Sequence, residues 1–208
     1  MKNFKIFFIL VLLINCSKNF ETNLPPKFSF DSEFRNIDTY GGSNEDIAHA
    51  IIKTYDGGFA VIGNTKSNDK DLNFRTKNDS DILFLKFKPD LELDYIKTYG
   101  GSDDDRGYDL VQLEDRGFIL LGYSKSSDGD ASLNKGQHDN WVIRINQKGE
   151  IIWEKSFGFT GHDHAYNIIS TIDGGFFFNG FLDVTASNGL GMSNKKIKSS
   201  KKHGVGEF

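Results

Sequence analysis

The sequence predicts an all-β protein built from repeated four-stranded antiparallel units. First, the stretch TYGGSNEDIAHAIIKTYDGGFAVIGNT, which begins at Thr39, recurs twice further along the chain. Second, the 208 residues include 22 glycines and 19 phenylalanines but only 3 prolines, a composition that suits pleated strands joined by tight turns. Third, short apolar or alternating runs lie between turn residues, and no helical spacing of comparable length competes with them.

The repeat has a fixed spacing. The second copy begins at Thr98 and the third at Ser156, and matching positions lie 59 and then 58 residues apart. The matching positions are Asp46, Asp105 and Asp163; Asp56, Asp115 and Asp173; Gly58, Gly117 and Gly175; and Gly63, Gly122 and Gly180. Tyr95 and Trp153 also match, and their recurrence indicates that they pack between units rather than bind a ligand.

Each unit divides into four short strands, which in the first unit are predicted at residues 46–54, 58–65, 81–88 and 92–99. The turn between the first two strands reads DGG, DRG and DGG in the three copies, so its second glycine is always present. We expect a type I turn that starts at the aspartate, with this glycine in the left-handed conformation of a G1 bulge. A phosphate-binding role is disfavoured, because no helix follows to present its amino terminus.

Four antiparallel strands every ~60 residues are typical of a β-propeller blade. Residues 34–40 align with the fourth strand of the other units, so the chain is predicted to open on a lone strand. The full expectation is an incomplete β-propeller of one lone strand, two full blades and half of a third, with units near 41–99, 100–157 and 158–208. The ring would be completed by missing blades of a longer protein or by self-association, since unpaired strand edges favour docking.

A family resemblance supports this architecture. The YGGS–D, DGGF and D-x-W-V-I-R-I motifs, with Trp153 near the end of a unit, resemble the ~60-residue propeller repeats of secreted bacterial proteins and lipoproteins. They are also similar to delta-60 repeats and distantly similar to quinoprotein-type blades. The resemblance covers residues 34–208 and implies an architecture and an exported bacterial protein, but no particular activity.

The amino terminus resembles a bacterial lipoprotein signal. Lys2 and Lys5 precede an apolar run at residues 6–14, which is too short to span a bilayer as a helix but suits a signal peptide. The resemblance implies removal of residues 1–15, lipidation of Cys16 and a polar tether at residues 16–33. It also implies attachment to the outer membrane or cell surface of a Gram-negative bacterium. The alternative is a plain secretory signal and a periplasmic or secreted protein.

The charge pattern argues against nucleic acid as a partner. The net charge is −4, and a basic stripe of the kind that binds phosphate backbones is missing from the repeats. A group of lysines near the carboxyl terminus is interpreted as solubilising a loop; it comprises Lys195, Lys196, Lys198, Lys201 and Lys202.

The acidic loops between the second and third strands are the candidate calcium ligands. Carboxylate oxygens are the ligands that Ca²⁺ prefers, but the spacing is not that of an EF-hand loop, and Asx-turns explain the aspartates equally well. The candidates are Asp69, Asp71, Asp128, Asp130 and Asp139, with Asp81 as the counterpart of Asp139. No other cofactor is predicted.

His162 and His164 form the other candidate metal motif. Alternate residues of a strand face one way, so the two imidazoles could converge on zinc. The equivalent residues of the other units are Asp104 with Arg106, and Glu45 with Ile47, so the histidines are not a feature of the unit. On this comparison no zinc site is predicted.

These observations favour a non-enzymatic function. The chain has no G-x-S-x-G motif, and Cys16 is its single cysteine, so no nucleophile stands out in the repeats. We expect a membrane-anchored lipoprotein whose propeller repeats bind a protein or a glycan. The alternative is a portion of a propeller enzyme, either glycan-active or quinoprotein-like, because one fold hosts many functions.

Overall fold

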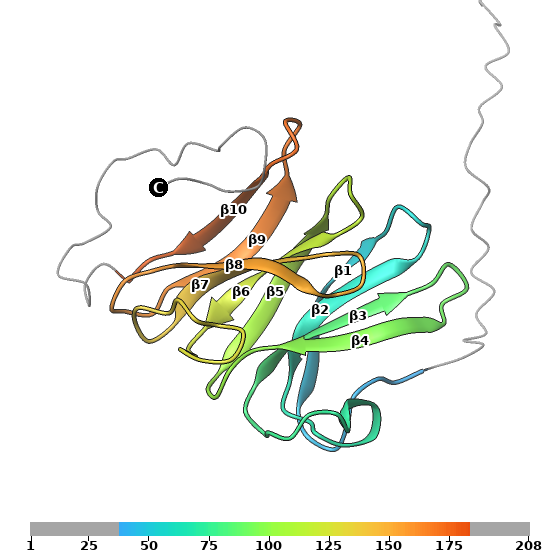
Figure 1. The fold of residues 1–208 in the computed structure, drawn as a ribbon, viewed down its shortest axis with the longest axis horizontal. Helices are drawn as coiled ribbons and strands as arrows, with labels where there is room; N and C mark the ends of the chain where they lie inside the picture. Colours follow the sequence, from blue (N-terminus) through green and yellow to red (C-terminus); the bar gives the residue numbers. More distant parts are fainter. Residues whose placement is uncertain (1–37, 184–208) are drawn as a thin grey trace, which may run out of the picture. The chain divides into compact units, whose positions relative to one another are not determined.

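The computed structural model describes residues 38–183, which contain ten β-strands and one short 3₁₀ helix (Figure 1). The strands form two four-stranded antiparallel sheets and one two-stranded sheet, so the predicted all-β class is confirmed. A search of these residues for an apolar helix long enough to cross a bilayer finds none. Cys16, residues 34–37 of the predicted lone strand and the carboxyl-terminal lysines lie outside the described residues.

In each sheet the strands follow chain order, and each strand pairs with the next. The first sheet contains β1 (Asp46–Lys53), β2 (Phe59–Thr65), β3 (Asp81–Phe87) and β4 (Leu93–Tyr99), with the 3₁₀ helix η1 (Lys70–Leu72) between β2 and β3. The second contains β5 (Asp105–Gln112), β6 (Phe118–Ser124), β7 (Asp139–Ile145) and β8 (Ile151–Phe157). The third contains β9 (His164–Ser170) and β10 (Phe176–Phe181).

These bounds agree with the predicted strands to within about one residue at each end, as expected where turn residues mark the limits. The lone strand is the exception. Residues 38–42 form no strand, although Tyr40 packs edge-on against Phe87 of β3 with ring centroids 5.2 Å apart.

The sheets pack face against face. Strand β5 lies against β1, β2 and β3 of the first sheet, and β9 lies in the same way against β5 and β6 of the second (Figure 1). The first interface is filled by large buried side chains, among them Phe84 and Phe118, whose rings meet edge to face at 5.2 Å. Burial of each such ring contributes roughly 2–3 kcal/mol of transfer free energy.

Tyr95 and Trp153 both lie at these interfaces. The hydroxyl of Tyr95 donates to the carbonyl of Gln147 in the second sheet at 3.1 Å, and its ring packs on Phe84. Trp153 of β8 stacks on Phe176 of β10, with ring centroids 6.3 Å apart. The two residues therefore join successive sheets, in the role that their recurrence predicts.

The turn between the first two strands of each unit differs from the prediction in two respects. The left-handed residue is the first of the pair, since Gly57, Arg116 and Gly174 have φ of +87°, +67° and +81°. The turn begins at Thr54, whose carbonyl accepts the N–H of Gly57 at 2.9 Å, and not at the aspartate. The prediction that the second glycine supplies the positive φ is therefore wrong.

The second glycine is instead required by a close approach. A Cβ on Gly58 would lie 2.1 Å from the carbonyl oxygen of Phe87, and one on Gly117 would lie 2.4 Å from that of Ile145. Both contacts come from the third strand of the same sheet. Gly175 meets no such strand among the described residues, and the nearest atom to its Cβ would be 3.0 Å away.

The last recurring glycine is also explained by crowding. Gly63, Gly122 and Gly180 lie where the first strand shifts register by one residue, a β-bulge in each unit. A Cβ on Gly63 or Gly122 would lie 1.8 Å from a carbonyl oxygen of the neighbouring strand. The bulge presses the first strand's backbone onto this position in every copy.

The second strand of a unit is buried in the two complete sheets and exposed in the third. All seven residues of β6 are buried, whereas no residue of β10 is buried and four of its six are exposed. Ile119 of β6 is 1% exposed, and the matching Phe177 of β10 is 64% exposed. The difference arises because Ile119 packs against Ala165 and Ile168 of β9, whereas no described sheet lies on the face of β10 that carries Phe177.

Candidate functional site

The candidate site is the end of the sheets where the YGGS loops and the long loops between second and third strands meet. It is organised by the recurring aspartate that starts each first strand. Asp105 is fully buried and accepts hydrogen bonds from the N–H of Gly101 at 2.7 Å and from the hydroxyls of Ser124 and Ser126 at 2.5 and 2.7 Å. Several donors on one carboxylate fix the loop and the strand end together.

The same arrangement recurs in the other units. Asp46 accepts the N–H of Gly42 at 2.8 Å, the hydroxyl of Ser67 at 2.9 Å and the hydroxyl of Thr65. In the third unit Asp163 accepts the N–H of Phe159 at 2.7 Å. The recurring aspartates are therefore internal acceptors for the loop backbone.

The calcium candidates in the long loops also face the YGGS loops. Asp69 accepts the N–H and the hydroxyl of Ser43, and the matching Asp128 accepts the N–H of Ser102 at 2.7 Å. Asp71 and Asp130 accept the N–H groups of Gly41 and Gly100 at 3.0 and 3.2 Å. Each carboxylate thus holds a backbone amide that lies 26 or 30 residues away in the sequence, so these bonds join two loops and are not the local Asx-turns of the sequence interpretation. In residues 38–183 no three carboxylates lie close enough together to share an ion.

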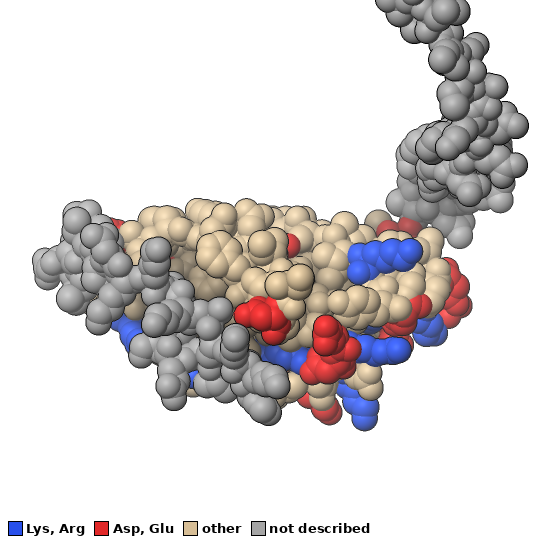
Figure 2. Space-filling model, turned by 90° about the horizontal axis from the view of Figure 1, so that it is seen from above, with Lys and Arg blue, Asp and Glu red and all other residues tan. Residues whose placement is uncertain are grey.

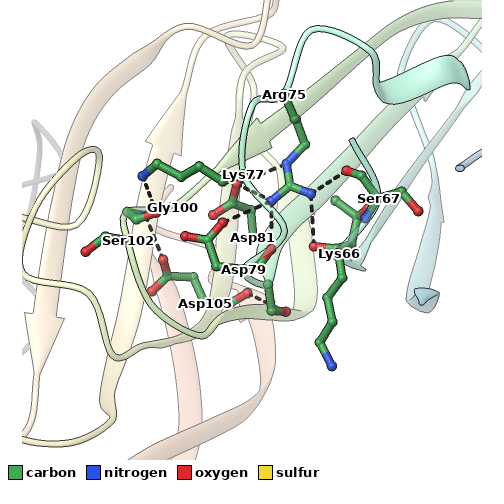
Figure 3. A network of polar contacts seen from close by, with 12 residues as sticks. Lys66, Ser67, Arg75, Lys77, Asp79, Asp81, Gly100, Ser102 and Asp105 are labelled. Carbon is green, nitrogen blue, oxygen red and sulfur yellow. Dashed lines mark hydrogen bonds and ion pairs between the residues drawn. The ribbon is translucent and has the colours of Figure 1, made fainter. Parts of the chain in front are cut away.

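Asp81 and Asp139 start the third strands and have different surroundings. Asp81 forms two hydrogen bonds with Arg75, at 2.7 and 3.1 Å, and this guanidinium also donates to the carbonyls of Ser67 and Asp79 (Figure 3). Asp139 has no arginine partner and accepts the N–H of Lys135 at 2.7 Å. The two complete sheets therefore pair the same buried carboxylate with different donors, and in each case Oδ1 has no hydrogen-bond partner among the described residues.

The charges around Arg75 are unbalanced. One buried guanidinium is shared by Asp81 and Asp79, and Asp105 lies nearby (Figure 3). Burial raises the pKa of Asp81 to about 6, and the neighbouring carboxylates add to this rise while Arg75 opposes it. Burial also raises the pKa of Asp139 to about 6. The network in Figure 3 joins the long loop of the first sheet to the YGGS loop of the second, because Lys77 donates to the carbonyl of Gly101 at 2.8 Å.

Each long loop between the second and third strands exposes one large apolar side chain close to a buried one. Phe74 in the first loop and Leu133 in the second are 59 residues apart, and they are 51% and 45% exposed. Two residues before them, Leu72 and Ala131 are fully buried. Each loop is therefore anchored by a buried side chain and displays a large apolar one at a matching position. Elsewhere, acidic and basic side chains lie side by side, as on the face shown in Figure 2.

The structure adds a third histidine to the pair noticed in the sequence. His138 immediately precedes β7, and its ring lies beside those of His162 and His164. Among residues 38–183 these three form the one group of histidine, cysteine or acidic side chains with the spacing of a metal site. Sequence reasoning considered two of them and missed His138, which lies just before a strand of the preceding unit.

Comparisons with known proteins identify no relative. No protein-family model matches the chain, and no curated protein matches it. A function is therefore inferred from the residues of this chain alone.

Proposed function

We propose that this protein is a membrane-anchored bacterial lipoprotein whose β-sheets are propeller blades and whose long-loop end binds a protein partner without catalysing a reaction. The observation that carries the proposal is the matched pair Phe74 and Leu133, exposed on firmly held loops of neighbouring sheets. Exposed apolar side chains on a rigid base are typical anchors of protein interfaces, since little conformational entropy is lost when they bind.

A protein partner fits this pair better than a glycan does. An aromatic ring such as Phe74 offers a flat face to a sugar, but leucine at the equivalent position offers none. Both side chains instead suit shallow apolar pockets on a protein surface. The carboxylates beneath them are already engaged with backbone amides of the YGGS loops, so the apolar tips are the more available contacts.

The propeller interpretation is supported by the repeated sheet packing and by the exposed strand β10. The exposed Phe177 matches Ile119, which is buried where the second sheet packs on the third, so Phe177 marks the face of β10 on which a further sheet would pack. Further blades or a second copy of the chain would supply it. The anchor is supported by the sequence alone, through the apolar run before Cys16.

The binding proposal is tested by site-specific photo-crosslinking in the full-length lipoprotein. A photoreactive phenylalanine analogue is placed at position 74 or, as a matched control, at Tyr55, which is 65% exposed in the opposite turn. We expect a discrete protein adduct from position 74 that is lost when Leu133→Ser is added, and none from position 55. Equal adducts from both positions, or none from position 74, would contradict the proposal. Binding to a glycan array that depends on Phe74 would replace the protein partner by a glycan.

The anchor is tested separately by metabolic labelling with a palmitate analogue. Label should enter the wild-type chain and be absent from Cys16→Ala. Labelling of both chains, or of neither, would favour a plain secretory signal.

A further inference from the structure

The junctions between sheets bring the same three positions together twice. At the second junction the N–H of Asp163 donates to the carbonyl of His138 at 2.6 Å, and this bond places His138 beside His162. At the first junction the N–H of Asp105 donates to the carbonyl of Ser80 at 2.7 Å. Each of these residues lies 58 positions before its counterpart, so the backbone scaffold is the same at both junctions.

The side chains on this scaffold differ. At the first junction the positions carry Ser80, Asp104 and Arg106, and the last two form an ion pair at 2.9 Å. At the second junction the same positions carry His138, His162 and His164. The ion pair of the first junction therefore has no counterpart at the second junction, where all three positions carry imidazoles.

The imidazole nitrogens converge. Nδ1 of His138 lies 3.0 Å from Nε2 of His164 and 3.1 Å from Nδ1 of His162. The ligating atoms of all three rings lie within 4.8 Å of one another. Nitrogen ligands that hold a tetrahedral zinc ion at about 2.0–2.1 Å are themselves about 3.3 Å apart. Small rotations of the side chains would therefore bring these nitrogens to ligating positions.

The surroundings hold the rings in place. Tyr123 of β6 stacks on His138 with ring centroids 4.5 Å apart and contacts His164 at 4.4 Å. Its hydroxyl donates to Asp104 at 3.0 Å, which ties the cluster to the first junction. Burial, together with the neighbouring imidazoles, lowers the pKa of His138 to about 4, and burial lowers that of His164 as well. Burial therefore favours the neutral form of both rings, which is the form that binds metals.

We propose that His138, His162 and His164 form a binding site for one divalent late transition-metal ion, with Zn²⁺ as the reference ion. Three imidazole ligands suit zinc, copper and nickel, whereas Ca²⁺ and Mg²⁺ require oxygen ligands. His162 is exposed, so the fourth coordination position faces solvent and would accept water or a side chain of a partner. The proposal of a metal site does not depend on the protein partner proposed for the long-loop end.

The test is isothermal titration of the metal-stripped, full-length protein with ZnCl₂. We expect one ion per chain, no heat with CaCl₂, and affinity reduced at least tenfold in each of His138→Ala, His162→Ala and His164→Ala. The control is His49→Ala, because His49 bonds Asn64 away from this junction and should leave the affinity unchanged. Retained affinity in His138→Ala would reduce the site to an adventitious surface pair and overturn the proposal. So would an absence of zinc binding by the wild-type chain.

Because an alanine variant can lose affinity through misfolding, the wild-type chain provides a second test. Co²⁺ in a four-coordinate site gives strong visible absorption, and Co²⁺ bound loosely by surface groups with six ligands gives only weak absorption. We expect the strong bands, and we expect one equivalent of Zn²⁺ to abolish them. Weak bands at saturating Co²⁺ would contradict the proposed geometry.

Discussion

The steric explanation for the second turn glycine makes a sharp prediction through two matched substitutions, Gly117→Ala and Gly175→Ala. The two glycines occupy the same position in successive units, and neither is among the glycines with positive φ. A Cβ on Gly117 would lie 2.2 Å from Nη1 of Arg144 and 2.4 Å from the carbonyl oxygen of Ile145. A Cβ on Gly175 would have 3.0 Å to its nearest neighbour. Only the first substitution should force the backbone to move, because at Gly175 the side chain of Thr171 need give way by only a few tenths of an ångström.

The cost of that movement follows from what surrounds Gly117. The guanidinium of Arg144 is buried and donates to Asp115 and to the carbonyls of Phe118 and Ile145, so it cannot turn aside without losing bonds. Overpacking costs about 1–3 kcal/mol, and loss of a charged hydrogen bond costs a similar amount, so we expect Gly117→Ala to destabilise the fold by roughly 3 kcal/mol. Gly175→Ala should be neutral or stabilise by about 0.4–1 kcal/mol, because alanine restricts the unfolded chain.

Thermal and urea unfolding of both variants beside the wild type would measure the difference. For a domain of this size the expected loss in Gly117→Ala corresponds to a Tm lower by roughly 6–12 °C. If Gly175→Ala costs as much as Gly117→Ala, a strand also covers the third turn. If Gly117→Ala costs nothing, the steric explanation fails.

Three further predictions concern the turn, the recurring aspartate and the buried charges. Arg116→Gly should stabilise the fold by about 1 kcal/mol, because a φ of +67° costs conformational free energy in a residue other than glycine. A loss of stability in urea unfolding would refute this. Asp105→Ala should destabilise the fold by roughly 3 kcal/mol or more, since buried donors lose their acceptor. Asp128→Ala on the exposed loop should cost about 1 kcal/mol. Similar losses in the two variants would contradict the role of Asp105 as the buried acceptor for the loop. Because the folded pKa of Asp81, about 6, lies above the ordinary 3.8, its stabilising contribution is complete below pH 3.8 and is lost as the pH rises through 6. The wild type should therefore gain roughly 2–3 kcal/mol over Asp81→Asn between pH 7 and 4, and a difference that does not change with pH would contradict this.

The strands were predictable because their signals are local. Alternating apolar residues, the DGG turn and the recurring aspartates mark both ends of each strand, and the structure departs from those limits by about one residue. The lone strand at residues 34–40 rested on alignment with the fourth strand alone, and its last residues, Asp38 to Tyr40, are not part of a strand.

The cause of a recurring residue is harder to predict than its presence. Comparison of the copies shows that the second turn glycine is required, but positive φ and backbone crowding leave the same trace in a sequence. Arg116 was the available clue, because it occupies the first turn position and still adopts the left-handed conformation. The positive φ of this turn therefore lies at the first position, and the glycine after it serves another purpose.

The histidine cluster was missed for the opposite reason. Repeat comparison identifies what every unit needs, so it discounts residues that occur in one unit only. His162 and His164 were set aside on that ground, and His138 lies 24 residues before His162, just ahead of a strand of the preceding unit. Subtracting 58 from all three numbers gives Ser80, Asp104 and Arg106, which would have revealed a shared junction. Arg75 was overlooked in the same way, because the second unit has no counterpart to it.

The most direct test of the repeated-sheet architecture is amide hydrogen exchange along β6 and β10. Both are second strands, but β6 lies between β5 and β7, whereas β10 pairs only with β9 among the described strands. The account predicts slow exchange at every interior amide of β6, and alternation along β10 between slow amides that face β9 and fast amides that face outward. Uniformly slow exchange along β10, or fast exchange in β6, would contradict it.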